Sequence, residues 1–220
     1  MSATAPLPVV VLISGSGTNL QSLIDAAPDI DIDIRAVFSD RADAHGLQRA
    51  TAAHIPNHHI DPDSYSSRDD FDRELVRQID AYHPELIVLA GFMRILSPPF
   101  VRQYAGRTLN IHPSLLPRYR GLHTHRRVLE AGDRLHGCSI HFVTDELDGG
   151  PLIAQAHVTV FPGDDEQTLS ARVQEREHKL YPLVVEWIAT GRLIVREAQA
   201  CLDGEPLRTP VVYDQDEEIR

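Results

Sequence analysis

The chain has 220 residues, of which 42% are hydrophobic and 24% charged, as in an ordinary globular protein. Its 21 basic and 32 acidic residues give a net charge of −11, which argues against nucleic acid or an anionic membrane as the main partner. The sequence has no apolar run of the roughly 20 residues that a membrane span needs and no signal peptide pattern, so we expect a cytoplasmic protein. Its two cysteines, Cys138 and Cys201, lie far apart, as is typical of a reducing compartment.

Short apolar runs alternate with helical patterns through the first half of the chain. The run at residues 7–13 is continuous and rich in β-branched residues, which predicts a strand buried on both faces of a parallel sheet. Residues 86–90 predict another buried strand, and further strands are predicted at residues 31–38, 56–60 and 108–111. Helical patterns lie between them at residues 20–27, 42–53 and 67–82. This alternation predicts an α/β fold with an open, mostly parallel twisted sheet and helices on both faces, as in Rossmann-like proteins.

The second half departs from this alternation. A helix is predicted over residues 123–131, and the strand patterns at 138–143 and 152–160 predict an antiparallel excursion late in the chain. A long helix over 164–189 should end at Gly191, and residues 192–196 add a strand. Without repeats or a linker, we predict one domain over 1–220, with a core at 7–208 and a mobile acidic tail at 209–220.

A glycine-rich loop follows the first strand: Gly15, Ser16, Gly17, Thr18 and Asn19. Glycine lets the backbone approach an anion, and the following helix offers free N–H groups, so phosphate is the natural ligand. The loop matches neither a Gly-x-Gly-x-x-Gly pattern nor a lysine-containing P-loop. Asp40, after the second strand, stands where a dinucleotide-binding protein holds a ribose, so a nucleotide cofactor stays open as an alternative, beside a simple tight turn.

Asn110 and His112 stand at alternate positions where another predicted strand ends. Residues two apart in a strand point to the same side, so an amide donor and a proton-handling ring can face one reacting atom. Pro113 and Pro117 then hold the chain as a shaped loop, at the strand end where α/β proteins bind ligands. The alternative is a turn asparagine beside an ordinary surface histidine.

A second polar loop, residues 144–151, joins the two late strands. Asp145 and Glu146 fit a solvated turn, but Asp148 stands beside a glycine pair. If this loop folds over the Asn110 site, the carboxylate of Asp148 would meet His112 and raise its pKa above the usual value of about 6.5, making it a better acid near pH 7.

None of the histidine pairs has a zinc-ligand spacing, so we expect no metal. Without a nucleophile elbow or a cysteine nucleophile loop, we expect no acyl-enzyme.

Four motifs together resemble the phosphoribosylglycinamide formyltransferases, the folate-dependent glycinamide ribonucleotide transformylases of purine biosynthesis. They are Ile13-Ser-Gly-Ser-Gly-Thr-Asn19, Leu89-Ala-Gly-Phe-Met-Arg-Ile-Leu96, Asn110-Ile-His-Pro-Ser-Leu-Leu-Pro-Arg-Tyr-Arg-Gly-Leu-His-Thr-His125 and Val143-Thr-Asp-Glu-Leu-Asp-Gly-Gly-Pro151, and the likeness extends over about residues 9–208. The Asn-x-His and Ser-Leu-Leu-Pro core is shared with methionyl-tRNA formyltransferases and formyltetrahydrofolate hydrolases. The phosphate loop, the Gly-Leu-His-Thr-His ending and the lack of an appended domain favour the ribonucleotide branch.

The resemblance implies that 10-formyltetrahydrofolate donates a formyl group to the glycine amine of glycinamide ribonucleotide, without a metal. It implies the catalytic residues Asn110, His112 and Asp148, with Asn110 donating to the oxyanion and His112 acting as general acid. The implied ribonucleotide contacts are Gly15, Ser16, Gly17, Thr18, Asn19 and Glu177. The implied folate contacts are Arg68, Met93, Arg94, Ile95, Leu96, Asn110, Thr144, Asp145, Glu146, Leu147 and Asp148.

Three other functions stay open from the sequence: a 10-formyltetrahydrofolate hydrolase, a nucleotide-cofactor oxidoreductase and a non-catalytic ribonucleotide-binding module. The protein is expected to be a monomer or a homodimer. Its expected partners are the two small-molecule substrates.

Overall fold

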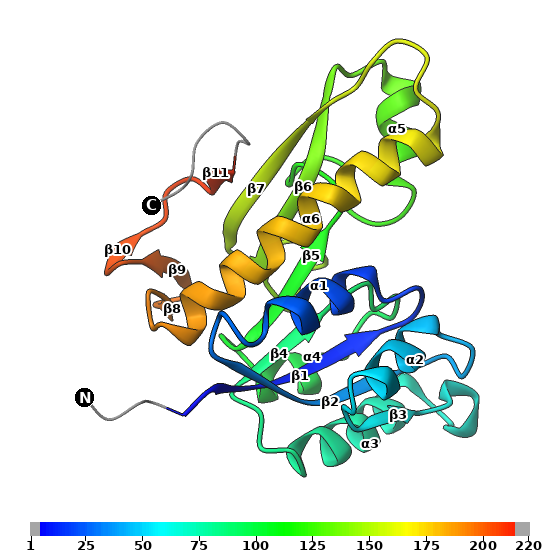
Figure 1. The fold of residues 1–220 in the computed structure, drawn as a ribbon, viewed down its shortest axis with the longest axis vertical. Helices are drawn as coiled ribbons and strands as arrows, with labels where there is room; N and C mark the ends of the chain where they lie inside the picture. The colour runs from blue at the N-terminus through cyan, green and yellow to red at the C-terminus, as the bar shows by residue number, and fades with distance from the viewer. Residues whose placement is uncertain (1–4, 214–220) are drawn as a thin grey trace. The chain divides into compact units, whose positions relative to one another are not determined.

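The computed structural model describes residues 5–213 and divides the chain into two compact units, 1–110 and 111–220, called here the N-terminal and the C-terminal unit (Figure 1). Strand β5 (Thr108–His112) contains the division, because Asn110 is the last residue of the first unit and Ile111 the first of the second. The prediction that residues 1–220 form one domain stays a prediction.

Parallel strands form the centre of the N-terminal unit. They are β1 (Leu7–Ile13), β2 (Ile32–Ser39), β3 (Asn57–His59), β4 (Leu86–Leu89) and the start of β5, in the order β5-β4-β1-β2-β3. Residues Val9 to Ile13 and Leu86 to Val88 are fully buried. The continuous apolar runs predicted this double burial, which parallel sheets covered by helices require.

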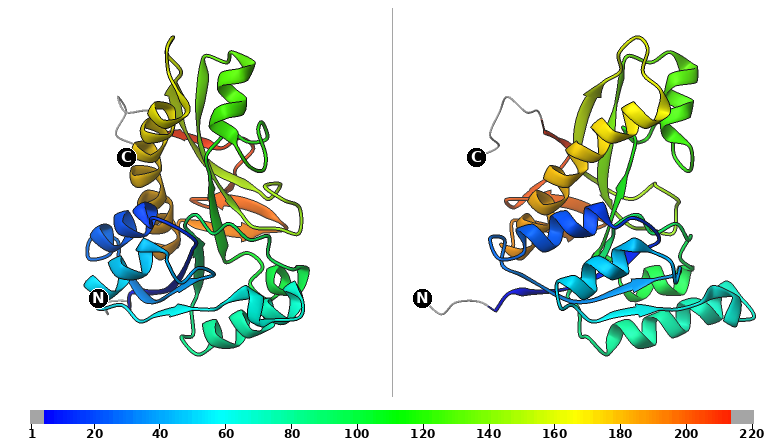
Figure 2. Two further views of the ribbon diagram at one scale, coloured as in Figure 1. Left: turned by 90° about the vertical axis from the view of Figure 1, so that its right-hand side faces the viewer. Right: turned by 45° about the vertical axis from the view of Figure 1, so that its right-hand side comes forward.

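Helices cover both faces of this sheet. Helices α1 (Thr18–Ala26) and α2 (His45–Ala52) lie on one face, and α3 (Arg68–Asp80) and α4 (Pro98–Gln103) on the other (Figure 2, left). A 3-10 turn, η1 (Pro62–Ser64), precedes α3, whose N-cap Ser67 accepts a hydrogen bond from the backbone N–H of Asp70 at 3.1 Å. The predicted α/β fold with a mostly parallel sheet is confirmed.

The C-terminal unit contains the predicted antiparallel excursion. Strands β6 (Leu135–Phe142) and β7 (Leu152–Thr159) pair antiparallel, and β11 (Val211–Tyr213) pairs parallel to β7. Helix α6 (Glu166–Ala189) packs along β6 and β7, and α5 (Thr124–Ala131) contacts α6 (Figure 1). At the N-terminus of α6 the carboxylate of Asp165 accepts from the backbone N–H of Thr168 at 2.7 Å.

The end of α6 matches its predicted glycine stop. Gly191 has φ +71°, the left-handed conformation that ends many helices, and its N–H donates to the carbonyl of Ile188 at 2.9 Å. The strand predicted at 192–196 is β8 (Leu193–Arg196). It belongs to a separate antiparallel sheet with β9 (Gln199–Leu202) and β10 (Glu205–Pro206), which the sequence did not predict. Of the tail predicted to be mobile, residues 214–220 lie outside the described residues, and 211–213 form β11.

Candidate functional site

The glycine-rich loop lies where β1 passes into α1, as the sequence predicted. Gly17 is the N-cap of α1 with φ +70°, no side chain caps the helix, and its first turn contains no acidic residue. The N–H groups at this end therefore face no competing carboxylate from the helix itself, which suits an anion.

Helix α2 packs directly on this loop. A Cβ atom on Gly17 would lie 2.5 Å from the Cα of Gly46, so no larger residue fits there without a shift of the backbone. The N–H of Gly46 donates to the carbonyl of Gly15 at 3.0 Å, and Nε of Arg49 donates to the carbonyl of Ser16 at 2.9 Å. Helix α2 thus supports the loop through two of its carbonyls, and the guanidinium of Arg49 lies next to it.

Asp40, the residue that kept a dinucleotide ligand open, is engaged with the protein. Its Oδ1 accepts a hydrogen bond from Oγ of Ser14 at 2.6 Å. The same Oγ accepts from the backbone N–H of Met93 at 2.8 Å. Asp40 therefore braces the residue that precedes the glycine-rich loop. The sequence did not single out Ser14.

The predicted folate segment, Met93 to Leu96, follows β4. Met93 and Ile95 are 68% and 57% exposed, although both are large and apolar, whereas Leu96 is buried. Exposed apolar side chains of this size mark a surface that a ligand can cover. Arg94 stacks on the ring of Phe71 at 4.7 Å, and its Nε is buried without a hydrogen-bond partner among the described residues.

Next to this segment, α3 carries a buried acid. Asp72 is 2% exposed and accepts from the backbone N–H of Ser97 at 2.5 Å. Burial raises the pKa of Asp72, and the Ser97 hydrogen bonds and the charges of Arg68 and Arg94 offset part of that increase. Arg68, predicted to contact folate, is the exposed first residue of α3.

Asn110 and His112 both belong to β5, at the alternate positions that the sequence indicated. Asn110 is half-buried, and His112 is 7% exposed. The loop after His112 contains a cis Leu116–Pro117 peptide bond.

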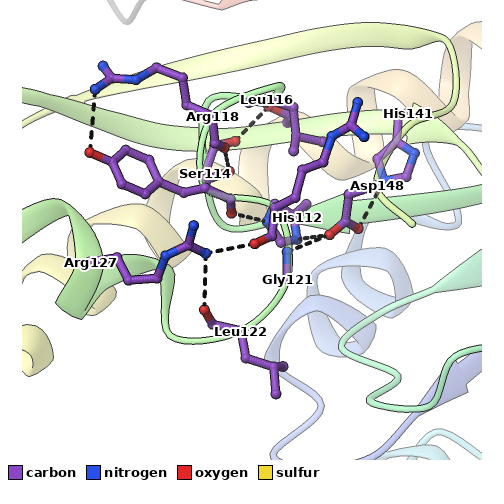
Figure 3. Close-up of polar contacts among 12 residues, drawn as sticks. His112, Ser114, Leu116, Arg118, Gly121, Leu122, Arg127, His141 and Asp148 are labelled. Atoms are coloured by element: carbon purple, nitrogen blue, oxygen red, sulfur yellow. Dashed lines mark hydrogen bonds and ion pairs between the residues drawn. The ribbon is translucent and has the colours of Figure 1, made fainter. Parts of the chain in front are cut away.

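The ring of His112 lies between two oxygen acceptors (Figure 3). Its Nε2 forms a hydrogen bond of 2.9 Å with the carbonyl of Tyr119, and its Nδ1 lies 3.5 Å from Oδ2 of Asp148. A carbonyl can only accept, so Nε2 carries a proton. The contact between His112 and Asp148, which the sequence could state only as a condition, is therefore present. The catalytic role of the pair stays a prediction.

The position of Asp148 depends on backbone geometry at two points. Asp148 has φ +49°, and its Oδ2 accepts from the backbone N–H of Gly121 at 2.9 Å. A Cβ on Gly150 would lie 1.8 Å from the carbonyl oxygen of Phe142, so only glycine fits there. Gly150 therefore lets the chain pass close to the backbone of Phe142, two residues after Asp148.

A second histidine lies on the other side of this carboxylate. His141 Nε2 is 3.8 Å from Asp148 Oδ1 (Figure 3). His141 Nδ1 forms a 3.0 Å hydrogen bond with the carbonyl of Phe142. Burial lowers the pKa of His141, although the Phe142 hydrogen bond and Asp148 act in the opposite direction. His141 is thus neutral at pH 7 and does not form an ion pair with Asp148. His112 is the other histidine within reach of this carboxylate.

A buried polar network, which the sequence did not predict, anchors the loop after His112. Oγ of Ser139 on β6 donates to the carbonyl of Ser114 at 2.6 Å and accepts from the N–H of Leu116 at 3.0 Å. Nε2 of Gln155 on β7 donates to Ser139 Oγ and to the Leu116 carbonyl, both at 2.8 Å. Polar residues at 139 and 155 within apolar strand patterns could have indicated this network. A polar group buried in a strand needs a hydrogen-bond partner.

Further contacts hold Tyr119. Its hydroxyl donates to Oδ2 of Asp133 at 2.6 Å, and the guanidinium of Arg127 lies 5.3 Å from the centre of its ring. Arg127 Nη1 also donates to the carbonyls of Arg120 at 2.7 Å and Leu122 at 3.4 Å (Figure 3). The side chain of Tyr119 and the carbonyls of the residues that follow it are therefore held by several contacts.

The remaining predicted contacts are spread over the C-terminal unit. Thr144, Asp145, Glu146 and Leu147 are exposed, and Glu146 pairs with Arg120. Glu177 lies on α6 and is 6% exposed. Within this unit the structure joins Asp148 to His112. In the N-terminal unit, the predicted ligand residues lie on the loop after β1 and the start of α1, after β4, at the start of α3 and, for Asn110, in β5.

Comparison with known proteins gives consistent matches along the chain. Residues 7–185 match the family described as Formyl transferase. The phosphoribosylglycinamide formyltransferase of Escherichia coli is 59% identical over 211 residues, covering 95% of this chain and 99% of the relative, and that of Haemophilus influenzae is 46% identical over 201 residues, covering 90% and 95%. The solved structure of the Coxiella burnetii enzyme of the same name has a TM-score of 0.91 at 54% identity, covering 95% of this chain and all of the other.

The described residues contain neither a metal-ion cluster nor a membrane-spanning helix. Within residues 5–213, no group of three or more His, Cys, Asp or Glu side chains is arranged to hold a metal ion. Over the same residues, no helix has the length and apolar character to cross a membrane.

Proposed function

Because the chain belongs to the formyl transferase family, we propose that it transfers a formyl group from 10-formyltetrahydrofolate to the glycine amine of glycinamide ribonucleotide. The products are formylglycinamide ribonucleotide and tetrahydrofolate, in purine biosynthesis. The observation that carries this proposal is His112, buried at the end of β5 with its two ring nitrogens facing Tyr119 and Asp148.

The reaction needs an oxyanion stabiliser and a proton donor. The glycine amine attacks the formyl carbon, a tetrahedral oxyanion forms, and the bond from that carbon to N10 breaks while N10 gains a proton. Asn110 donates a hydrogen bond to the oxyanion, a contact whose loss typically lowers the rate by about 10²–10³. His112 acts as general acid, and the proton lost by the amine balances the one that N10 gains.

Asp148 supports His112 in this scheme. Its carboxylate lies 3.5 Å from Nδ1 of His112. His141, on the other side of the carboxylate, is neutral and does not form an ion pair with it. With Tyr119 accepting at Nε2, both ring nitrogens face an oxygen acceptor. Asp148 also helps to organise a water that relays the proton lost by the amine toward the leaving nitrogen, where it replaces the proton that His112 has given to N10.

The binding residues follow the chemistry of the two substrates. Gly15 to Asn19 bind the ribonucleotide phosphate at the uncapped end of α1, and Glu177 binds the glycinamide part. Exposed apolar Met93 and Ile95, with Arg94 and Leu96, bind the folate ring system. Arg68 and residues 144–148 complete the folate contacts. Once bound, the reactants gain from being held in a reactive orientation.

We also propose the setting in which the protein works. The family match crosses the division at Asn110, which supports one functional domain made of both units. The net charge of −11 favours small-molecule substrates over nucleic acid or membrane, in the cytoplasm, with the protein a monomer or a homodimer.

One absorbance assay tests the reaction. Purified protein is mixed with 10-formyltetrahydrofolate, with and without glycinamide ribonucleotide, and tetrahydrofolate formation is followed. We expect product only when the ribonucleotide is present. Equal turnover without it would make the protein a hydrolase, and turnover in neither mixture would leave a binding module. Binding of NAD(P) would favour the oxidoreductase, although Asp40 is already bonded to Ser14.

A further inference from the structure

Ser14 joins two segments of the N-terminal unit that the sequence treats as separate. It follows β1, directly precedes the glycine-rich loop, and is 6% exposed. Its Oγ donates to Asp40 Oδ1 at 2.6 Å and accepts from the N–H of Met93 at 2.8 Å. With its proton committed to Asp40, the hydroxyl presents its lone pairs to Met93 in a fixed direction.

The backbone of Ser14 adds a second connection. Its N–H donates to the carbonyl of Gly91 at 3.2 Å, which continues the β1–β4 ladder past the end of β4. Beyond Gly91 the chain turns away, and the N–H of Met93 has no strand partner to use. The hydroxyl of Ser14 supplies the acceptor that the next ladder carbonyl would otherwise provide.

We propose that Ser14, held in direction by Asp40, is a positioning residue that couples binding at the glycine-rich loop to binding at the segment 93–96. This inference rests on the proposed function, which assigns the ribonucleotide phosphate to the loop and folate to the segment. A phosphate that orders Gly15 and Ser16 also orders Ser14, their neighbour in the chain. The directional bond to Met93 then lowers the cost of ordering the folate segment.

Such coupling is reciprocal, so folate strengthens ribonucleotide binding by the same factor. A purely structural role for Ser14 predicts something different. In that case, loss of the hydroxyl would weaken the fold or both affinities, but the factor by which one ligand improves the other would stay unchanged. The coupling factor therefore separates the two roles.

Calorimetry on the full chain measures this factor. The Kd of tetrahydrofolate is determined with and without saturating glycinamide ribonucleotide, because tetrahydrofolate has no formyl group and no turnover occurs. We expect the ribonucleotide to tighten folate binding about fivefold or more in the unmodified protein. In Ser14→Ala the ratio should fall close to one.

Two further variants test the part played by Asp40. Asp40→Asn keeps an oxygen acceptor for the Ser14 hydroxyl and should keep most of the coupling. Asp40→Ala removes the acceptor and should lose it. Ser64→Ala is the matched control, because it deletes another serine–aspartate bond of this unit, from Ser64 Oγ to Asp61 Oδ2 at 3.2 Å, on an exposed turn. It should retain the full ratio.

The outcomes are distinct. An unchanged ratio in a folded Ser14→Ala variant overturns the inference, as does a ratio of one in an unmodified protein that turns over both substrates. In both cases the proposed function stands. If the Tm shows that Ser14→Ala does not fold, the two Asp40 variants test the inference instead. An unchanged ratio of tetrahydrofolate Kd values in Asp40→Ala then overturns the coupling. Absence of turnover in the unmodified protein overturns both proposals.

Discussion

A buried pair of histidines should make the C-terminal unit sensitive to acid. His136 on β6 is 1% exposed, and its Nε2 lies 3.0 Å from Nδ1 of His125 on α5. Burial, followed by the nearby His125 and His112, lowers the pKa of His136 to about 4, although Asp133 acts in the opposite direction. Burial lowers the pKa of His125 as well. Both rings are therefore neutral in the folded protein at pH 7.

The sign of the effect follows from proton binding. In the unfolded chain His136 titrates near 6.5, so between that pH and about 4 the unfolded state binds a proton that the folded state does not. The stabilisation is complete above the unfolded pKa and is lost as pH falls through this window. The limiting slope is about 1.4 kcal/mol per pH unit. Allowing for solvent screening, we expect His136 to account for about 1–2 kcal/mol between about pH 7 and about pH 5.

The single tryptophan makes this measurable. Trp187 is 1% exposed and lies on α6, in the same unit as His136, so its fluorescence during urea unfolding reports on that unit. The free energy of unfolding is compared at the two pH values for the unmodified protein and for His136→Gln. His157→Gln, a change on the neighbouring strand β7, is the control.

We expect His136→Gln to lose about 1–2 kcal/mol of the pH dependence and the control to keep it. A His136→Gln variant whose stability falls with acid as steeply as that of the unmodified protein would refute the reasoning, whatever its stability at pH 7. The comparison uses differences between pH values, so a general loss of packing in the variant does not affect the result.

Four further predictions concern turnover. His112→Ala should lower kcat sharply with little change in ribonucleotide affinity, and near-normal turnover in a steady-state assay would remove its role as acid. Asn110→Ala should lower kcat by about 10²–10³; a loss confined to KM would contradict oxyanion stabilisation. Asp148→Asn should lower kcat, because the carboxylate that faces Nδ1 of His112 is lost, and an unchanged kcat would argue against its support of His112. Gly17→Ala puts a Cβ 2.5 Å from Gly46 at φ +70°, so KM for the ribonucleotide should rise about tenfold, and an unchanged KM would place the phosphate elsewhere.

The sequence predicted the strands and long helices because their patterns are continuous. Buried parallel strands and α6 have periodicity over many residues, and their ends differ from the prediction by only a few positions. Helix α4 was missed because Pro98 and Pro99 indicate a break, whereas proline is also accepted in the first turn of a helix. The strands β9 and β10 were missed because they are short and carry little apolar pattern.

The candidate site was predictable only in part, because some of its contacts join residues that are far apart in the sequence. The alternation of Asn110 and His112 is local, and the strand β5 preserves it. The contact of Asp148 with His112 depends on a left-handed backbone at Asp148 and on the N–H of Gly121, neither of which spacing reveals. Ser14 and Ser139 act through hydrogen bonds to distant backbone groups, and such bonds leave no periodic signal in a sequence.

The surroundings of His112 indicate which nitrogen would deliver a proton. Nδ1 faces the carboxylate of Asp148, whereas Nε2 donates to the carbonyl of Tyr119. If His112 is the acid, Nε2 is the nitrogen that can exchange this neutral acceptor for N10 of the folate, while the carboxylate stays in place. The bonds that fix Tyr119, to Asp133 and beside Arg127, then oppose this exchange. The contacts that order the loop after β5 would thereby also determine how readily His112 gives up its proton.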